Sequence, residues 1–195
     1  MDQPRRLVLA STSRYRKELL GRLGLRFEVA SPAVEERPFP KEAPADTALR
    51  LAVLKARSIS GSFPDALIIG SDQVASSEGR VLRKPGDHAN ATRQLRALSG
   101  KAADFHTAVC VLDSKSGGLQ SRVVACRVVF RSLDREQIES YLRREQPYDC
   151  AGSAKAEGLG IALIARIATD DPTSLIGLPL IALTEMLARA GLPVI

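Results

Sequence analysis

Hydroxyl and cationic side chains gather where the first predicted strand turns into the first predicted helix. The apolar run 7–10 leads directly into Ser11, Ser13, Arg16 and Lys17. The start of a helix leaves backbone N–H groups without partners and carries a partial positive charge. Together with these side chains, it forms a site suited to a phosphate chain. An ordinary N-cap followed by a solvated basic helix face explains the same residues equally well.

Asp72 is the strongest single candidate for catalysis. The almost wholly apolar run 66–70 predicts a buried central strand that ends at Ser71, Asp72 and Gln73. A carboxylate at the C-terminal end of such a strand lies where ligand crevices form in α/β proteins. It could bind a divalent cation there or take a proton from water. A turn-forming aspartate that bonds its local backbone is the competing interpretation.

Further charged residues could complete such a site. Lys84 precedes Pro85 after a predicted short hairpin, and could be a fixed cation for phosphate or simply a solvated side chain. Lys55 lies on the apolar side of its predicted helix, where it needs a partner or a path to water. Glu35 and Glu36 occupy an extended loop and, taken alone, are surface acids.

Histidines and cysteines do not indicate a metal site. His88 and His106 lack ligand spacing, and we assign neither a role. Cys110, Cys126 and Cys150 are odd in number and form no CxxC pair, so neither a zinc site nor a disulfide framework is expected. Buried reduced thiols of an intracellular protein are the expectation.

These candidates must be positioned by strands and helices that alternate along the chain. Helices are expected over 13–23, from Asp46 or Thr47 to near Gly61, and over 87–100, 132–144 and 179–191. Strands are expected over 7–10, 27–30, 66–70, 107–112, 122–130 and 161–167. The two long strands joined by the loop 114–118 argue against a purely parallel sheet. We therefore predict an α/β fold with a mixed sheet.

Composition limits the kind of partner. The chain has 195 residues, 45% of them hydrophobic and 26% charged, which suits a soluble globular protein of one domain or two lobes. The net charge of +6 favours an anionic partner. Basic residues are spread out and aromatic residues are few, so a nucleotide fits better than a nucleic-acid strand. No signal peptide or membrane span is visible, and a cytoplasmic location is expected.

Several motifs, in order and at matching spacing, resemble the Maf family of nucleoside-triphosphate pyrophosphatases over essentially the whole chain. These motifs are LASTSRYRKELL (9–20), VEE (34–36), Lys55 in LAVLKARS, IIGSDQV (68–74), Lys84-Pro85, LSGK (98–101), CAGS…EGLG (150–160) and IGLPL (176–180). The resemblance implies a single domain over 1–195 with an elongated, two-lobed α/β fold. That fold is related to inosine-triphosphate pyrophosphatase, with a central mixed sheet and a cleft between the lobes.

The resemblance also implies a reaction: hydrolysis of a nucleoside triphosphate to the monophosphate and pyrophosphate with a divalent cation such as Mg²⁺, Mn²⁺ or Co²⁺. Asp72 would be the catalytic acid or base, and Glu35 would join it in binding the cation. The residues expected to hold the triphosphate are Ser11, Arg16, Lys55 and Lys84. Attack of water at the α-phosphorus needs a base, a bridging cation and fixed positive charge, which are these residue types.

Three positions are similar to the branch of the family that acts on 7-methyl-GTP: Tyr15, Gln73 and Glu157. Methylated guanine is cationic and stacks well on an aromatic ring, and a carboxylate at Glu157 can accept from guanine N1–H and the exocyclic amine. The branch commonly has Trp where Tyr15 stands and Pro where Arg14 stands, and Tyr stacks less strongly than Trp.

Two alternatives stay open. The enzyme could act on dTTP, UTP or other non-standard nucleotides instead. The chain could also be a non-catalytic protein that binds nucleic acid or regulates division, with its basic charge serving a macromolecule. A homodimer is compatible with the resemblance, although no surface feature of the sequence establishes one.

Overall fold

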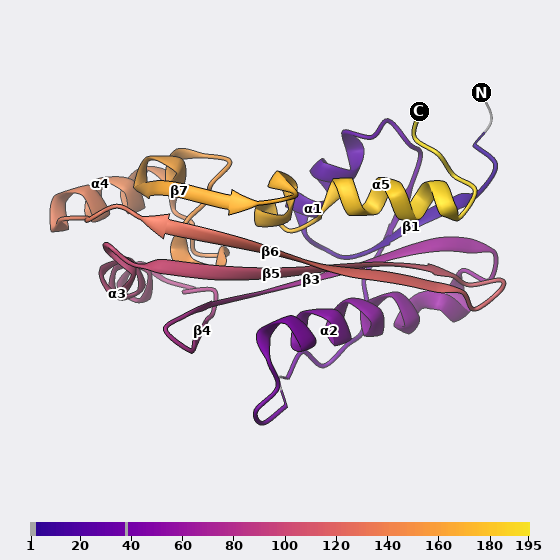
Figure 1. The fold of residues 1–195 in the computed structure, drawn as a ribbon, viewed down its shortest axis with the longest axis horizontal. Helices are drawn as coiled ribbons and strands as arrows, with labels where there is room; N and C mark the ends of the chain where they lie inside the picture. The colour runs from indigo at the N-terminus through magenta and orange to yellow at the C-terminus, as the bar shows by residue number, and fades with distance from the viewer. Residues whose placement is uncertain (1–2, 38) are drawn as a thin grey trace. The chain divides into compact units, whose positions relative to one another are not determined.

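The computed structural model describes residues 3–37 and 39–195, and its elements are labelled in Figure 1. The chain divides into two compact units. The first contains the described residues of Met1–Gln73, Thr107–Val124 and Asp171–Ile195, and the second contains Val74–His106 and Ala125–Asp170. Three strands pass from one unit into the other: β3 (Ala66–Ser77), β5 (Ala102–Asp113) and β6 (Leu119–Phe130).

The first unit is built on a sheet, and the parallel strands of this sheet come from the first part of the sequence. Its strand order is β2-β1-β3-β5-β6, with β1 at Arg6–Ala10 and β2 at Glu28–Ala30. β1 pairs in parallel with both β2 and β3, in a register that aligns Leu9 with Ile69. The buried residues of β1 and of the first part of β3 are nearly all apolar, as expected for strands covered on both faces.

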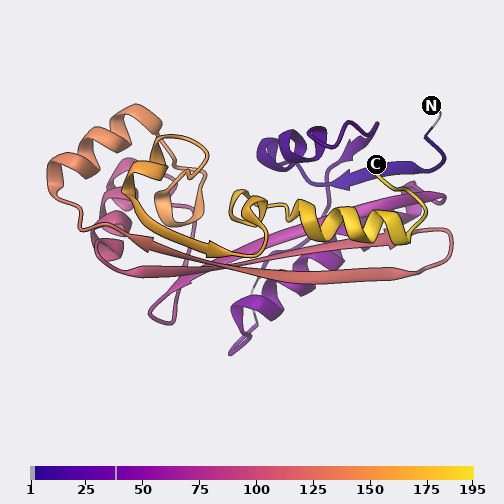
Figure 2. The same ribbon diagram turned by 45° about the horizontal axis from the view of Figure 1, so that its top comes forward.

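Helices cover both faces of this sheet. Figure 2 shows α1 (Arg14–Gly21) and α5 (Leu180–Arg189) on one face and α2 (Pro44–Ile59) on the other. The short helices η1 (Ser60–Ser62) and η4 (Pro172–Ile176) complete the unit. Apolar side chains of α1 and α5 pack against β1, β3 and β5 in one core, which includes Leu9, Leu19, Leu20, Ile69, Val109, Leu183 and Leu187.

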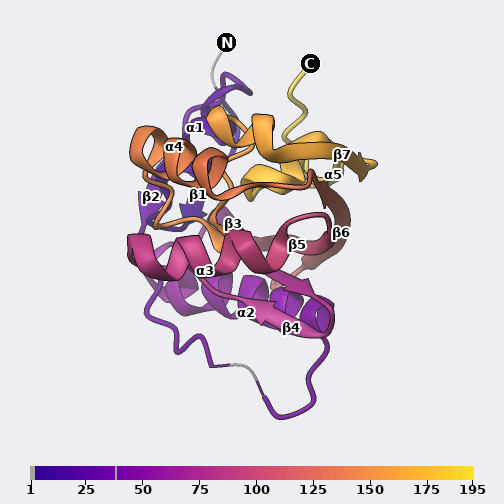
Figure 3. The same cartoon turned by 90° about the vertical axis from the view of Figure 1, so that its left-hand side faces the viewer.

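The second unit contains the hairpin β3–β4, with β4 at Arg80–Leu82, and β7 (Ile164–Thr169), which pairs antiparallel with β6. Glu78 and Gly79 both have positive φ, as a tight two-residue hairpin requires. The helices α3 (His88–Leu98) and α4 (Arg135–Glu145) lie against each other, as Figure 3 shows. The short helices η2 (Ala151–Ser153) and η3 (Leu159–Leu163) occupy the glycine-rich segment.

The predicted α/β fold with a mixed sheet is confirmed, since β1 pairs in parallel and β4 and β7 pair antiparallel. The predicted hairpin after β3 is also confirmed. Among the described residues, the structure contains no helix with the length and apolarity needed to cross a bilayer. Cys110 and Cys126 are free and buried, and burial raises their thiol pKa values to about 12 and about 11.

Several sequence predictions about element ends are wrong; for example, the strand expected over 107–112 runs from Ala102 to Asp113. The helix expected to begin at Asp46 or Thr47 starts at Pro44, because proline at the first position needs no N–H partner. The helix expected to open at Ser132 is instead capped by Asp134, whose carboxylate accepts from the Gln137 amide. The strand expected from residue 161 begins only at Ile164, because η3 takes up the preceding residues.

Candidate active site

Asp72 lies inside β3 rather than at its end, which corrects the sequence prediction. β3 continues to Ser77, because its last residues pair with β4 after its neighbour β1 has ended at Ala10. Asp72 therefore lies just beyond the carboxyl end of β1, the strand that leads into α1. The crevice expected at the carboxyl ends of parallel strands still applies, with β1 as the strand that ends.

Lys55 is the direct partner of Asp72. Its Nζ donates to Asp72 Oδ1 at 2.6 Å, and both side chains are buried, with 7% and 11% exposed. The apolar side of α2 carries Lys55 to this position, and the predicted need for a partner is confirmed. An ammonium buried beside a carboxylate satisfies both charges, which neither could do alone in an apolar interior.

Glu36, in the loop that precedes α2, contacts the same lysine. Its Oε1 lies 2.5 Å from Lys55 Nζ, while its side chain stays 58% exposed. The neighbouring Glu35, predicted as a cation ligand, has its carboxylate 2.8 Å from Arg37 Nε and is 70% exposed. Sequence reasoning thus missed Glu36 as the acid beside Lys55, because two adjacent glutamates in an extended loop carry no pattern that separates them.

The N-terminus of α1 brings hydroxyls and a guanidinium into the first unit's site. Ser13 caps the helix by accepting from the Arg16 amide, and the buried Ser11 accepts from the Ser13 amide at 3.1 Å. Burial lowers the pKa of Arg16, while the nearby charges of Asp72 and Glu36 act in the opposite direction. Arg16 therefore lies within electrostatic reach of both carboxylates.

Segment 174–177 is tied to β3 by polar side chains. Gln73 Nε2 donates to Thr107 Oγ1, Ser174 O and Leu175 O at 2.9, 2.9 and 3.1 Å. The Gly177 carbonyl accepts from Ser71 Oγ and from Arg16 Nε, both at 2.9 Å. Sequence reasoning missed this role of Ser71 and Gly177, which only the motif IGLPL could have suggested. The Gln73 amide nitrogen is committed to these contacts, so its Oε1 is the atom left for a ligand.

Tyr15 has a cation on its ring. The Arg14 guanidinium lies 4.7 Å from the Tyr15 ring centroid and also donates to the Tyr15 hydroxyl at 2.7 Å. Both residues belong to the first turn of α1. The two departures from the usual residues of the 7-methyl-GTP branch are therefore in contact with each other.

Lys84 and Glu157 belong to the second unit. Lys84 is exposed between β4 and α3, and Glu157 is exposed in the turn between η2 and η3. Their predicted roles toward phosphate and base stay predictions.

The first unit offers carboxylates that suit a cation whose remaining ligands come from the substrate. No cluster of three or more His, Cys, Asp or Glu side chains able to hold a metal occurs within residues 3–37 and 39–195. Glu36 and Asp72 nevertheless supply two carboxylates that both contact Lys55 Nζ. Mg²⁺ is typically held by one or two carboxylates together with substrate phosphates, and these two residues fit that pattern.

Comparison with known proteins identifies the family. Residues 6–190 match the family model of Maf-like proteins. The chain belongs to the Maf family. Maf-family relatives named 7-methyl-GTP pyrophosphatase are similar over nearly the full length. The one from Thiobacillus denitrificans is 57% identical, covering 97% of this chain and 94% of the relative. The one from Cupriavidus pinatubonensis is 55% identical, covering 96% and 94%.

A third relative of that name, from Paraburkholderia xenovorans, is 53% identical to this Maf-family chain over all of it and 97% of the relative. Among solved structures, the Staphylococcus aureus Ham1 protein has a TM-score of 0.47 and 14% sequence identity, covering 65% of this chain and 72% of that one.

Proposed function

We propose that this protein is a nucleoside-triphosphate pyrophosphatase that hydrolyses 7-methyl-GTP to the nucleoside monophosphate and pyrophosphate. Three relatives at 53–57% identity carry that name. The observation that carries the proposal is the contact of Lys55 Nζ with Asp72 at 2.6 Å and with Glu36 at 2.5 Å. The charges of both carboxylates also act to raise the pKa of Arg16. Removal of modified nucleotides is the cellular role that this reaction would serve.

In the proposed reaction, water attacks the α-phosphorus and Asp72 takes its proton. The bond from the α-phosphorus to the bridging oxygen breaks, and pyrophosphate leaves with the electron pair. Arg16 and Lys55 supply fixed positive charge to the phosphate oxygens, while Ser11 and the first amides of α1 donate to them. Lys84 would add a further cation from the second unit.

Glu36 and Asp72 are the residues we propose to hold a divalent cation, in place of the pair Glu35 and Asp72. When bound, the cation supplies charge neutralisation on the phosphate oxygens. Lys55 already lies between the two carboxylates, so it holds them close together before any ligand arrives. The Lys55 ammonium would offer fixed positive charge to phosphate oxygens beside this pair.

Base selection is proposed to fall to Tyr15, Gln73 and Glu157. Tyr15 would stack on the cationic purine, and Glu157 would accept from its N1–H and amine. Gln73 would contribute only Oε1, since its amide nitrogen already donates to three oxygens. The cytoplasm is the proposed location of the enzyme, with a nucleotide as its partner; a homodimer remains compatible with it.

A steady-state comparison of 7-methyl-GTP, GTP, dTTP and UTP tests the proposal, with pyrophosphate release measured in Mg²⁺, Mn²⁺ or Co²⁺. We expect the highest kcat/KM for 7-methyl-GTP. Asp72→Asn should lower kcat by about 10²–10⁴-fold, the usual contribution of a general base. Asp65→Asn, at an exposed acid of the same unit, should leave kcat unchanged.

Two other outcomes of this comparison would contradict the proposal. A preference for dTTP or UTP would place it in the other branch of the family. Wild-type protein that hydrolyses none of the four nucleotides with any of the three cations would favour a binding protein.

A further inference from the structure

The turn that carries Glu157 is held on both sides by side chains of α4. Two residues before Glu157, the Lys155 amide donates to the Tyr141 hydroxyl at 3.0 Å. Two residues after it, the Leu159 amide donates to Glu145 Oε2 at 2.7 Å. Tyr141 and Glu145 are four residues apart on one helix face, so a single rigid element fixes both ends of the turn.

The Glu145 carboxylate lies inside this turn. Its Oε1 also accepts from Lys155 Nζ at 2.8 Å, and only 13% of the Glu145 side chain is exposed. A Cβ added at Gly158 would lie 2.7 Å from Glu145 Oε2, and one added at Gly160 would lie 2.5 Å from the Lys155 carbonyl oxygen. Gly158 is therefore needed because the chain folds tightly around this carboxylate, and Gly160 because it passes close to the Lys155 backbone.

Glu145 is charged in this setting. The Lys155 hydrogen bond and the Leu159 amide lower its pKa, against the opposing effect of burial. Charge-assisted hydrogen bonds of this type are stronger than neutral ones. Loss of the charge would weaken the two bonds that shape the turn.

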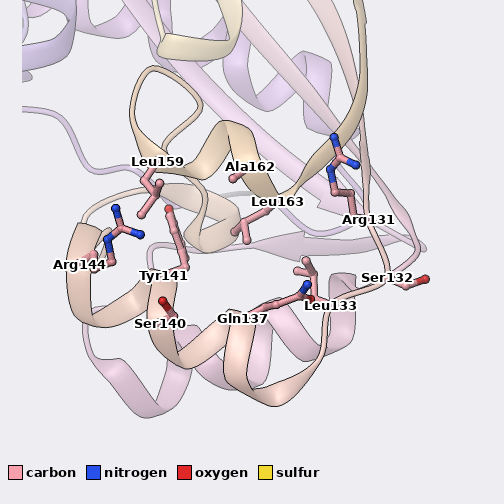
Figure 4. A pocket seen from close by; sticks show the side chains of 10 residues that line it. All are labelled: Arg131, Ser132, Leu133, Gln137, Ser140, Tyr141, Arg144, Leu159, Ala162 and Leu163. Atoms are coloured by element: carbon pink, nitrogen blue, oxygen red, sulfur yellow. The ribbon is translucent and has the colours of Figure 1, made fainter.

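A pocket adjoins the segment that follows Glu157. Figure 4 shows α4 facing Leu159, Ala162 and Leu163 across a pocket, with Tyr141 rising from the helix toward the Leu159 segment. The pocket has a volume of about 230 Å³. The polar bonds from Tyr141 and Glu145 hold the turn beside this open space.

We infer that Glu145 is a positioning residue for base recognition, with Tyr141 as its second support. Glu145 presents the turn so that the Glu157 carboxylate has one orientation toward a purine edge. The inference rests on the proposed function, and it assigns the preference for 7-methyl-GTP in part to a residue that does not touch the nucleotide.

The experiment compares Glu145→Gln with Glu139→Gln, an acid-to-amide change on the same helix at a side chain that contacts His88 and Arg143 instead. The readout is the ratio of kcat/KM for 7-methyl-GTP to that for GTP. We expect E145Q to lower this ratio at least about tenfold, mainly through KM. Glutamine keeps one acceptor oxygen, so its NH₂ would face one of the two donors, Lys155 Nζ or the Leu159 amide, and the charge that strengthens both bonds would be gone. E139Q should leave the ratio unchanged.

A double-mutant cycle separates positioning from general damage. If Glu145 acts through Glu157, E145Q should add no further loss of preference in a Glu157→Gln background, whereas independent effects would add. Tyr141→Phe, which removes one hydroxyl, provides a second variant should E145Q fail to fold. We expect Y141F to lower the ratio several-fold in wild type and not at all in the E157Q background.

Two outcomes overturn the inference: an unchanged ratio in folded E145Q (or in Y141F, should E145Q not fold), or full additivity with E157Q. Failure of the proposed function looks different, since wild type itself would then show no preference for 7-methyl-GTP. A wild type that prefers 7-methyl-GTP, an E157Q that loses the preference and an E145Q that keeps it would refute the role of Glu145 alone.

Discussion

Lys55 Nζ lies 2.6 Å from Asp72 Oδ1, with both side chains almost completely buried. α2 supplies the ammonium and β3 the carboxylate, so the pair joins a helix to the strand it covers. The same ammonium reaches Glu36 at 2.5 Å. One lysine thus organises two acids that would otherwise repel each other at the proposed cation site.

Removal of this ammonium should destabilise the fold. Lys55→Met leaves the Asp72 carboxylate buried without its partner, and we expect a loss of about 3 kcal/mol in the free energy of unfolding. Urea denaturation measures it. The double variant K55M/D72N should recover part of the loss, because the buried charge is then gone as well. Lys115→Met, in an exposed pair with Asp65, should stay within about 0.5 kcal/mol of wild type.

Glu36→Gln and Glu35→Gln form a matched pair at adjacent positions. We expect E36Q to raise the Mg²⁺ or Mn²⁺ concentration for half-maximal activity by about tenfold, because affinity for hard cations follows the charge of the ligands. E35Q should change it little, since that carboxylate faces Arg37. The reverse ranking in a metal titration would restore Glu35 as the ligand.

The contact between Arg14 and Tyr15 predicts a limit on stacking. A guanidinium on the ring occupies a face that a cationic purine would use and repels its charge. Arg14→Ala should therefore lower KM for 7-methyl-GTP by about two- to fivefold, the scale of an exposed cation–π contact. Arg22→Ala, which removes an equal charge at the other end of α1, serves as control. A KM that rises in R14A would mean that Arg14 helps to bind the nucleotide.

Local patterns predicted much of the fold and part of the site. Ser13 and Asp87, the first residues of two predicted helices, cap those helices, and each cap bond is made within three residues. Lys55 and Asp72 were predicted from chemistry and from their place among apolar residues, and the structure brings them together.

Features that depend on distant parts of the chain could not be predicted. β3 extends past Gly70 because β4 supplies partners for residues 75–77, which the polar sequence after the apolar run conceals. Glu36 is drawn to Lys55 by a contact between separate segments, and no periodicity marks it.

Asp171 is another residue of this kind, and it carries a prediction about stability. Its buried carboxylate accepts from the amides of Ile181 and Ala182, ten and eleven residues away, and also from Thr173. It caps α5, whose own N-cap residue, Pro179, has no side-chain acceptor. Asp171→Asn should cost about 2 kcal/mol in unfolding free energy, because one of the two accepting oxygens becomes an NH₂ group and some of these donors lose their acceptor.

Asp134→Asn provides the control for that measurement. Asp134 caps α4 within its own sequence, and asparagine is as good an N-cap as aspartate. Unfolding by urea should therefore show almost no change in D134N. An equal loss of unfolding free energy in both variants would show that the contacts of Asp171 with α5 stabilise the fold no more than an ordinary N-cap does.

Glu42 predicts a specific acid dependence. Its carboxylate accepts from Arg50 Nε at 2.6 Å, and this bond with the Phe39 amide and the Thr47 hydroxyl lowers its pKa from 4.5 to about 2. A carboxylate whose pKa is lower in the folded state stabilises the fold above its unfolded pKa, and that contribution is lost as pH falls through the folded value. The window for Glu42 therefore runs from about pH 4.5 down to about pH 2.

Glu42→Gln removes this titrating group. We expect E42Q to be less stable than wild type at pH 6, and the difference should shrink progressively between pH 4.5 and pH 2. Urea midpoints at several pH values measure it. In an Arg50→Met background the stability difference caused by E42Q should depend much less on pH, because the Arg50 bond is the largest cause of the lowered Glu42 pKa. A difference between E42Q and wild type that stays constant across this range would show that Glu42 titrates as it does in the unfolded chain.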